Sequence, residues 1–376
     1  MINFPALMGF TSGTAFLSGC LLLAKAPKAN LRANLFLGAF MITLSLTLLE
    51  IPLFAQNFHI TYPILFEIIG LIRFLTAPLL YYSIVHFTSL DKKIEKKDAL
   101  HLIPFIVFLI FRIPFFITGK NFEFSYQTGT IVFFILRNAL PVQTAVYWCL
   151  SFIRLQKHFK NAKQFSSNLN NIDLRWLTTF LWIVLLIVAV WLNLVFFNLE
   201  ALQKLTPFLY LLGIFFLSCF SLRQEEVFGY SKIERRELAT INDYKKDSPK
   251  RVTGARLAEL EIRLKSLMEI KKVYLDNDLS LPKLAGMLQA SCNETSFLIN
   301  ELNQENFYNF INKYRIEEAK RLLLSDAYDQ LNIVGIAFES GFNSKTTFNT
   351  TFKKLTGYSP TGFVKAEKIN KENSKK

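Results

Sequence analysis

Seven long apolar stretches fill the first 223 residues, and they constrain the fold more than any other feature of the sequence. Each is about twenty residues long, the length at which a helix rising ~1.5 Å per residue crosses a ~30 Å hydrocarbon core. The composition agrees, because 51% of the residues are hydrophobic and 38 are Phe, more than the core of a soluble domain requires. The sequence therefore predicts an all-α protein with a seven-helix transmembrane domain over 1–223, with spans near 5–24, 33–55, 60–87, 99–118, 128–153, 176–199 and 203–222.

Basic residues are distributed unevenly among the loops that join these spans. The first, third and fifth loops are rich in Lys and Arg, whereas the second, fourth and sixth hold only Lys120 and Lys204. Lys and Arg are retained on the cytoplasmic side of a membrane. The pattern therefore predicts that the N-terminus lies outside and that everything after Arg223 lies in the cytoplasm.

The first apolar stretch also allows a second interpretation. Its segment Leu17-Ser18-Gly19-Cys20 resembles the cleavage box of a bacterial lipoprotein. No basic segment precedes this box, however, and the residues after Cys20 stay apolar through Leu23. A retained first transmembrane helix is therefore favoured over cleavage and lipidation.

Five charged residues fall inside the spans, at the middle or in the predicted outer half of their helices. A charge at this depth is costly, so a pocket or an internal ion pair is expected. One interpretation is an outward-facing cavity whose arginines bind a small anionic ligand. The alternative is that Glu50 and Arg112 extend to the interface while the others pair internally and stabilise helix packing. The candidates for a ligand site are Glu50, Glu67, Arg73, Arg112 and Arg137.

The composition changes abruptly after Leu222. Residues 224–255 are polar and carry both charge signs, which predicts a linker. Short amphipathic helices with capping residues are expected from 256 to 368, followed by a basic tail over 369–376. The second half of the chain is therefore predicted to be a separate, seven-helix cytoplasmic domain.

Two pairs of short helices are expected within this domain. In the first pair, Ser280 caps the helix Leu281–Gln289 and Ser291 caps the next helix. Two short helices joined by a tight turn are the pattern of a helix-turn-helix unit.

The same pattern recurs further along the chain. Asn332 caps residues 333–340, Gly341 supplies the turn, and Ser344 caps Lys345–Thr356. One long helix between the two units would hold both second helices about one turn of DNA apart, roughly 34 Å, on one face.

At this point the residues resemble a known family. The stretch KYRIEEAKRLLL, followed by IVGIAFESGFNSKTTFNTTFKKLTGYSPTGFV, is similar to the C-terminal domain of the AraC/XylS family of bacterial transcription regulators. The resemblance covers about 100 residues, to Lys365, and is most specific in the second unit. It implies binding to double-stranded promoter DNA. Together with the predicted spans, this places the expected protein in the inner membrane of a bacterium. The residues that it implies at the DNA are Asn293, Ser296, Phe297, Asn300, Lys345, Thr346, Asn349, Thr350 and Lys353.

Several positions depart from the family pattern. Phe297 and Thr350 stand where many members have Arg, which removes two contacts each worth about 1–3 kcal/mol if bidentate to a base. Gln289 replaces the usual turn Gly of the first unit, and Thr295 replaces a usual Leu. From Glu261 onward, 17 Lys and Arg face 14 Asp and Glu, so the affinity for DNA should be moderate and salt-sensitive.

Other classes of function are less well supported by the residues. The four Cys and four His show no zinc spacing, and the chain has no Walker loop or GxGxxG, so neither a metal, a cofactor nor an enzyme is predicted. The leading prediction is a membrane-bound sensor and regulator, in which the linker over 224–255 passes a change to the DNA-binding domain and two copies can pair as a homodimer. The alternative is a membrane transporter or receptor whose helical cytoplasmic domain binds protein rather than DNA.

Overall fold

The computed structural model describes most of the chain. Within the described residues the secondary structure is helical, without a β-strand and with one isolated bridge between Ser166 and Ser280. The all-α prediction is therefore confirmed. The described ranges are 4–24, 30–89, 95–120, 122, 124–169, 173–197, 199, 202, 204–224, 227, 238, 254–325 and 331–373. The predicted linker over 224–255 lies largely outside them.

The chain divides into two compact units. Unit 1 comprises residues 1–158 and 173–229, and unit 2 comprises residues 159–172 and 230–376. Unit 2 is thus not a single stretch of sequence, because a short segment from the first half of the chain belongs to it.

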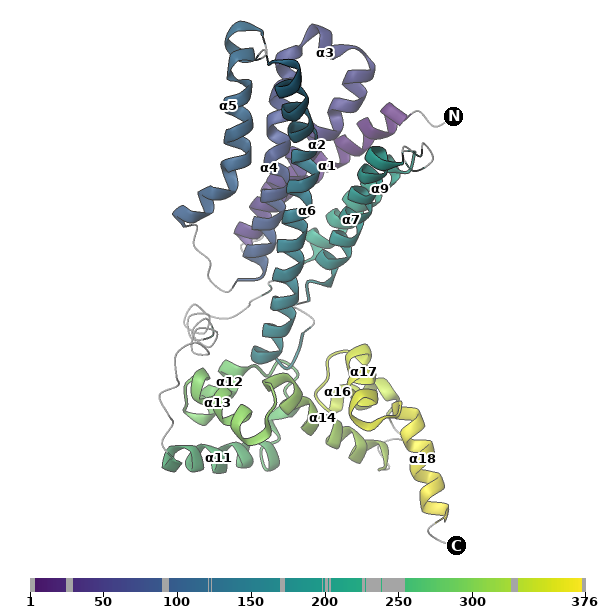
Figure 1. Cartoon of the computed structure of the whole chain (residues 1–376). Helices are drawn as coiled ribbons and strands as arrows, with labels where there is room; N and C mark the ends of the chain where they lie inside the picture. Colours follow the sequence, from purple (N-terminus) through teal and green to yellow (C-terminus); the bar gives the residue numbers. More distant parts are fainter. Residues whose placement is uncertain are drawn as a thin grey trace. The chain divides into compact units, whose positions relative to one another are not determined.

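Unit 1 contains the long apolar helices. They form an elongated array in which α6 is much the longest (Figure 1). The helices of this unit are α1 (Phe4–Ala24), α2 (Leu31–Ala55), α3 (Phe58–Thr61), α4 (Pro63–Phe87), η1 (Lys96–Leu102), α5 (Ile103–Thr118), α6 (Tyr126–Phe165), α7 (Arg175–Phe196) and α9 (Thr206–Arg223), of which the last seven residues of α6 belong to unit 2.

Seven of these segments are long and apolar enough to cross a membrane, with η1 and α5 counted together. Each overlaps one of the seven predicted spans, with most boundaries shifted by a few residues. The span predicted over 60–87 is interrupted at Tyr62, and Pro63 begins α4 because its fixed φ suits the first turn of a helix. The fifth helix continues to Phe165, well beyond the predicted end at 153.

The first two helices pack closely through small residues. A Cβ atom on Gly19 would lie 2.9 Å from the carbonyl oxygen of Gly38, so the α1 and α2 backbones meet where neither residue has a side chain. Two turns further along, the Ser12 hydroxyl donates to the carbonyl oxygen of Ser45 at 2.8 Å. The segment Leu17–Cys20, whose sequence resembles a cleavage box, lies within α1.

Large apolar side chains cover the outside of unit 1. Helix α5 buries none of its residues, and Ile110 and Ile117 are 58% and 77% exposed. An apolar surface of this extent is unfavourable in water and favourable in lipid, where the helical backbone satisfies its own hydrogen bonds. The surface therefore agrees with the apolar composition of the helices.

Unit 2 is built from short helices. The helix α14 lies between the α12 and α13 pair and the α16 and α17 pair (Figure 1). The helices are α11 (Gly254–Glu269), η2 (Val273–Leu275), α12 (Leu281–Leu288), α13 (Cys292–Asn303), α14 (Phe307–Leu323), α16 (Ile333–Glu339), α17 (Lys345–Thr356) and α18 (Pro360–Asn373).

The core around the second pair of short helices is rich in aromatic rings. Phe342, Phe348 and Phe352 are almost fully buried, and their rings pack edge-to-face and tilted at centroid distances of 5.3 and 5.5 Å. They pack on Ile316 and Ala319 of α14. Each such ring removes a large apolar area from water, so the apolar residues spaced along α17 hold it on the central helix.

Candidate functional site

The predicted caps begin the helices of both short pairs. Ser280 and Ser291 accept hydrogen bonds from backbone N–H groups in the first turns of α12 and α13. Asn332 and Ser344 do the same for α16 and α17. A side-chain acceptor at this position satisfies an N–H group that the helix itself leaves unpaired. The local boundaries of both helix-turn-helix units therefore agree with the sequence prediction.

The turn of the second unit depends on Gly341. Its φ of 88° is left-handed, and a Cβ atom there would lie 2.6 Å from the carbonyl oxygen of Tyr274. Only glycine combines this backbone conformation with so close an approach. The turn also closes by a hydrogen bond from the Phe342 N–H group to the Ala337 carbonyl oxygen, at 2.9 Å.

The outer face of α17 carries the second set of predicted DNA contacts. Three buried residues, Phe348, Thr351 and Phe352, face the core. The predicted contact residues lie on the other side, where Asn349 is half-buried and the rest are exposed: Lys345, Thr346, Thr350 and Lys353. A short helix with a buried stripe and a free polar face at its N-terminal end can enter the major groove of DNA.

The corresponding face of α13 carries the first set. Asn293, Ser296 and Phe297 are half-buried and Asn300 is exposed, whereas the core side holds Thr295 and Leu298. The Asn300 amide donates to the Ser296 hydroxyl at 3.4 Å. The structure thus places the predicted residues of each unit on one helix face; their contacts with DNA stay predictions.

A comparison with known families matches this part of the chain. Residues 284–366 match the family described as a helix-turn-helix domain, of the AraC type. The chain carries an AraC-type DNA-binding domain. No curated protein and no solved structure matches the chain significantly. The match begins within α12 and extends through the second helix-turn-helix unit into α18.

Within this AraC-type domain, the unusual Gln289 is supported by helix α11. Gln289 has a left-handed φ of 54°, a conformation that costs a residue with a Cβ atom roughly 1–2 kcal/mol. Arg256 donates to the Gln289 carbonyl oxygen at 2.9 Å, and Arg263 donates to its side-chain oxygen at 3.1 Å. These contacts hold the turn that glycine usually allows, so the departure from the family pattern leaves the turn intact.

Thr295 is accommodated in a similar way. It is fully buried, and its hydroxyl donates to the carbonyl oxygen of Ser291 at 3.0 Å. A buried hydroxyl with a partner costs little, whereas one without a partner is expensive. The replacement of Leu by Thr therefore preserves the fold of the first unit.

Positive charge is concentrated in the second helix-turn-helix unit. Several basic residues elsewhere in the domain are paired, such as Lys283 with Asp276 and Lys313 with Glu305. Helix α13 carries two Glu and no basic residue. By contrast, the described part of the chain offers no carboxylate partner within ion-pair distance to three lysines of α17, which are Lys345, Lys353 and Lys354. Electrostatic attraction to phosphate therefore favours the second unit.

A buried arginine that the sequence analysis missed links the parts of the domain. Arg315 of α14 is 1% exposed and donates to the carbonyl oxygens of Tyr274 and Asp276, each at 2.7 Å. It also donates to the hydroxyl of Ser167 at 3.0 Å and lies 5.7 Å from the ring of Phe342. Burial lowers the pKa of Arg315 to about 10. In the sequence, Arg315 is one of several charged residues in the helical stretch KYRIEEAKR, and its position there does not distinguish it from an exposed arginine.

The charges predicted inside the spans form two ion pairs. Arg73 of α4 pairs with Glu50 of α2, and Arg112 of α5 pairs with Glu67 of α4. Arg137 lies in α6, and its side chain is outside the described part of the structure. Internal ion pairs therefore form, but they include Glu50 and Arg112, which the alternative interpretation had extending to the interface. Whether any of these charges binds a ligand stays a prediction.

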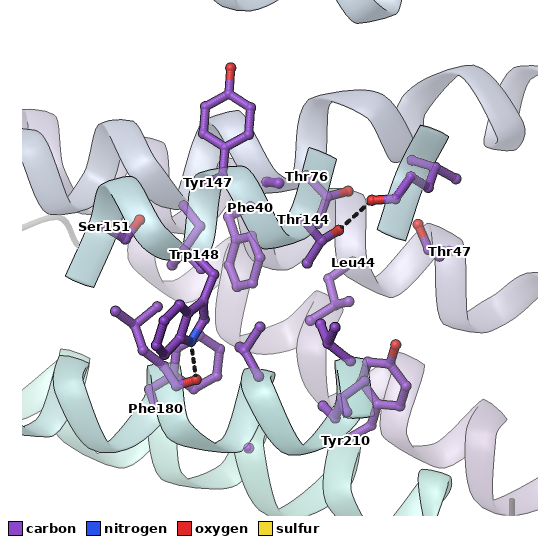
Figure 2. A pocket seen from close by; sticks show the side chains of 18 of the residues that line it. Phe40, Leu44, Thr47, Thr76, Thr144, Tyr147, Trp148, Ser151, Phe180 and Tyr210 are labelled. Atoms are coloured by element: carbon purple, nitrogen blue, oxygen red, sulfur yellow. Dashed lines mark hydrogen bonds between the residues drawn. The ribbon is translucent and has the colours of Figure 1, made fainter. Parts of the chain in front are cut away.

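Unit 1 also contains a pocket of about 130 Å³ between α2, α4, α6, α7 and α9. Of the four predicted ligand-site residues whose side chains the structure describes, Arg73 alone lines it. Figure 2 shows Trp148 and Phe180 toward one side and the hydroxyls of Thr76 and Thr144 toward the other. Trp148 is held in place because its indole N–H donates to the Leu181 carbonyl oxygen at 2.6 Å. The pocket is therefore apolar and aromatic with one polar side.

Proposed function

We propose that this protein is a membrane-bound, sequence-specific transcription regulator that couples a signal in its seven-helix domain to promoter binding by its AraC-type domain. The observation that carries the proposal is the pair of capped helix-turn-helix units, each with its predicted contact residues on one helix face, in the same chain as seven helices long enough to span a membrane. The basic loops support a cytoplasmic position for the DNA-binding domain.

The direct test is DNase footprinting with the full chain in lipid nanodiscs, against fragments of the genome of the source organism. We expect protection of a specific site that contains two half-sites about one helical turn apart, since each second helix reads one major groove. A matched control is a variant in which Thr346 and Asn349 are both changed to Ala, which leaves the core face of α17 intact. If the full chain bound all fragments equally at moderate salt, the regulator proposal would be wrong.

We further propose that the pocket in unit 1 is the signal input. Its size resembles that of a ~150 Å³ protein cavity that binds benzene, so the ligand body is about one aromatic ring or a short aliphatic chain. Arg73 already pairs with Glu50, which leaves the polar side with little net charge. The Thr76 hydroxyl is buried and has no hydrogen-bond partner among the described residues. These features favour a small neutral amphiphile with a hydrogen-bonding head over the anion expected from the arginines.

Three probes of one shape test this ligand class. Phenol, benzene and benzoate share the ring and differ only in the head group. We expect phenol to raise the melting temperature of the nanodisc-embedded chain more than either of the others, because it fills the apolar side and pairs with the Thr76 hydroxyl. The variant Thr76→Val should lose the preference for phenol over benzene.

Thr43→Val is the matched control for this experiment. Thr43 lies one turn from Thr47 in α2, does not line the pocket, and bonds only locally to the Phe40 carbonyl oxygen. Its substitution should leave the preference unchanged. Equal effects of phenol and benzene, or a larger effect of benzoate, would contradict the proposed ligand class and leave DNA binding unaffected.

A further inference from the structure

Helix α6 belongs to both compact units. It runs without interruption from Tyr126 to Phe165, and its residues up to His158 lie in unit 1 while Phe159–Phe165 lie in unit 2. Residues 159–168, the end of α6 and the turn after it, are therefore named the α6 end segment. This segment follows the fifth predicted span and precedes the sixth, so it comes from the seven-helix half of the sequence.

The α6 end segment is hydrogen-bonded into the DNA-binding domain. The Ser167 N–H group donates to the Leu279 carbonyl oxygen at 3.3 Å, and the Ser167 hydroxyl donates to the same oxygen at 2.5 Å. Ser166 forms an isolated antiparallel bridge with Ser280, which caps α12. The Asn168 amide donates to the Asp278 carboxylate at 3.2 Å. The contacts thus fall on Asp278, Leu279 and Ser280, where the first helix-turn-helix unit begins.

The same segment supplies acceptors to Arg315. Its guanidinium donates to both the hydroxyl and the carbonyl oxygen of Ser167, at 3.0 and 3.4 Å. Ser167 is 2% exposed. Without these acceptors, part of a buried cation would lose its hydrogen bonds, which is strongly unfavourable. The Arg315 guanidinium, with the carbonyl oxygens of Tyr274 and Asp276 that it binds, is named the Arg315 socket. The hydroxyl and carbonyl oxygens of Ser167 complete its hydrogen bonds, so the α6 end segment is part of the structure of the domain.

Arg315 links the segment before the first helix-turn-helix unit to the turn of the second. On one side it holds the carbonyl oxygens of Tyr274 and Asp276, which precede the first unit. On the other side it contacts the turn of the second unit, because a Cβ atom on Gly341 would lie 3.1 Å from the Arg315 Nε atom. A displacement of the segment at this point would change how both units are held against α14.

The helix that ends in this socket also lines the pocket of unit 1. Thr144, Trp148 and Ser151 of α6 face that pocket. From Ser151 to Phe165 the chain is continuous helix, about 21 Å at ~1.5 Å per residue. A helix transmits rotation and axial displacement over such a length, because its backbone hydrogen bonds resist local deformation.

We propose that the α6 end segment binds to the Arg315 socket. We further propose that α6, rather than the linker over 224–255, transmits a conformational change at the pocket to the two helix-turn-helix units. The proposal rests on the proposed function. It assigns the coupling to hydrogen bonds between Ser167 and the Arg315 socket, and it predicts that coupling and DNA affinity can be separated by substitution at Ser167.

The docking is tested first, without DNA or ligand, by hydrogen exchange on the full chain in nanodiscs. Ser167→Ala should speed exchange of the backbone amides over 274–281 by about tenfold or more, because it removes one acceptor of Arg315 and one bond to Leu279. Ser166→Ala is the matched control, since the Ser166 hydroxyl bonds within its own turn to Asn168. Equal exchange in the two variants would overturn the proposal.

The coupling is tested by reciprocity. If ligand binding at the pocket is coupled to DNA binding through α6, then binding of the promoter fragment found by footprinting must in turn change the conformation of the pocket. Trp148 and Trp191 line the pocket, so their fluorescence reports this change. We expect a DNA-dependent change in the wild type and in Ser166→Ala. In Ser167→Ala the change should be lost, while the affinity for the fragment stays within about threefold.

Insertions distinguish the two routes. Three glycines between Lys246 and Asp247 lengthen the linker, and three glycines after Lys160 interrupt the end of α6. We expect the DNA-dependent fluorescence change to survive the first insertion and to disappear with the second. Loss in the linker insertion alone would assign the coupling to the linker and refute the proposal. Failure of the wild type to bind any promoter would instead refute the proposed function, whatever the exchange data show.

Discussion

At the scale of single residues, the two helix-turn-helix units differ in what stabilises the turn between their helices. The first unit tolerates Gln289 in a left-handed turn because Arg256 and Arg263 bond to it from α11. The second unit keeps glycine at Gly341, where the backbone of Tyr274 leaves no space for a side chain. The same type of turn is therefore stabilised by hydrogen bonds in one unit and by close backbone packing in the other.

This difference leads to a prediction for glycine substitutions. Gly341 and Gly357 both have positive φ, but only Gly341 has backbone atoms near the position of a Cβ atom. Gly357→Ala should cost about 1–2 kcal/mol, the strain of the conformation alone. Gly341→Ala should cost clearly more, because the backbone of Tyr274 must also move. Hydrogen exchange of α16 and α17 in the full chain measures both, and equal effects would show that the close approach is relieved without cost.

A second prediction concerns the unpaired lysines of α17. Lys353→Ala should weaken binding to all DNA sequences by a similar factor and reduce the slope of log affinity against log salt concentration by about 1, as expected for one lost phosphate contact. Lys313→Ala is the control, since Lys313 pairs with Glu305. Fluorescence anisotropy at several salt concentrations gives both slopes. A specific loss at one base pair would instead indicate that Lys353 reads a base.

At the scale of helices, the capping residues explain why short segments form stable elements. Helix α13 begins with a capping box in which Ser291 and Glu294 each accept from the backbone N–H group of the other. The backbone hydrogen bond from Ser291 lowers the pKa of Glu294 below its ordinary value, and the nearby Arg256 acts in the same direction. The charged carboxylate is thus the form that stabilises the N-terminus of the helix.

This cap makes the stability of α13 depend on pH. Because the pKa of Glu294 is lower in the folded state, its contribution is complete above its unfolded pKa and is lost as the pH falls through the lowered value. We expect the protection of the first-turn amides of α13, that is, their exchange rate relative to the intrinsic rate at the same pH, to fall on acidification in the wild type. In Glu294→Gln the loss of protection at that site should be much smaller. Identical pH profiles would mean that the carboxylate does not stabilise the helix.

At the scale of the whole molecule, the distribution of charged and apolar residues predicts a topology. The odd number of candidate spans and the basic loops predict that the N-terminus lies outside and the C-terminal domain in the cytoplasm. Lys120→Cys, in a variant whose four native cysteines are serines, should react with an impermeant maleimide added to intact cells. Lys97→Cys and Lys371→Cys should react only after the cells are opened. Labelling of Lys371→Cys in intact cells would exclude access of the domain to DNA.

Local patterns in the sequence were sufficient for the elements of both halves. The seven apolar helices were predictable because the length of an apolar run depends on residues next to one another. The caps Ser280, Ser291, Asn332 and Ser344 were predictable for the same reason. The extension of α6 to Phe165 was missed, because its last turns are polar and carry no membrane signal.

Only the tertiary structure decided which distant residues meet. The sequence identified charges inside the spans, but the pairing of Arg73 with Glu50 and of Arg112 with Glu67 depends on how α2, α4 and α5 pack. Ser167 and Arg315 are far apart in the chain, and no local pattern around either residue indicates that they meet. Their hydrogen bond arises because burial requires every donor of the guanidinium to find an acceptor, and the packed fold, not the local sequence, determines which acceptor is near.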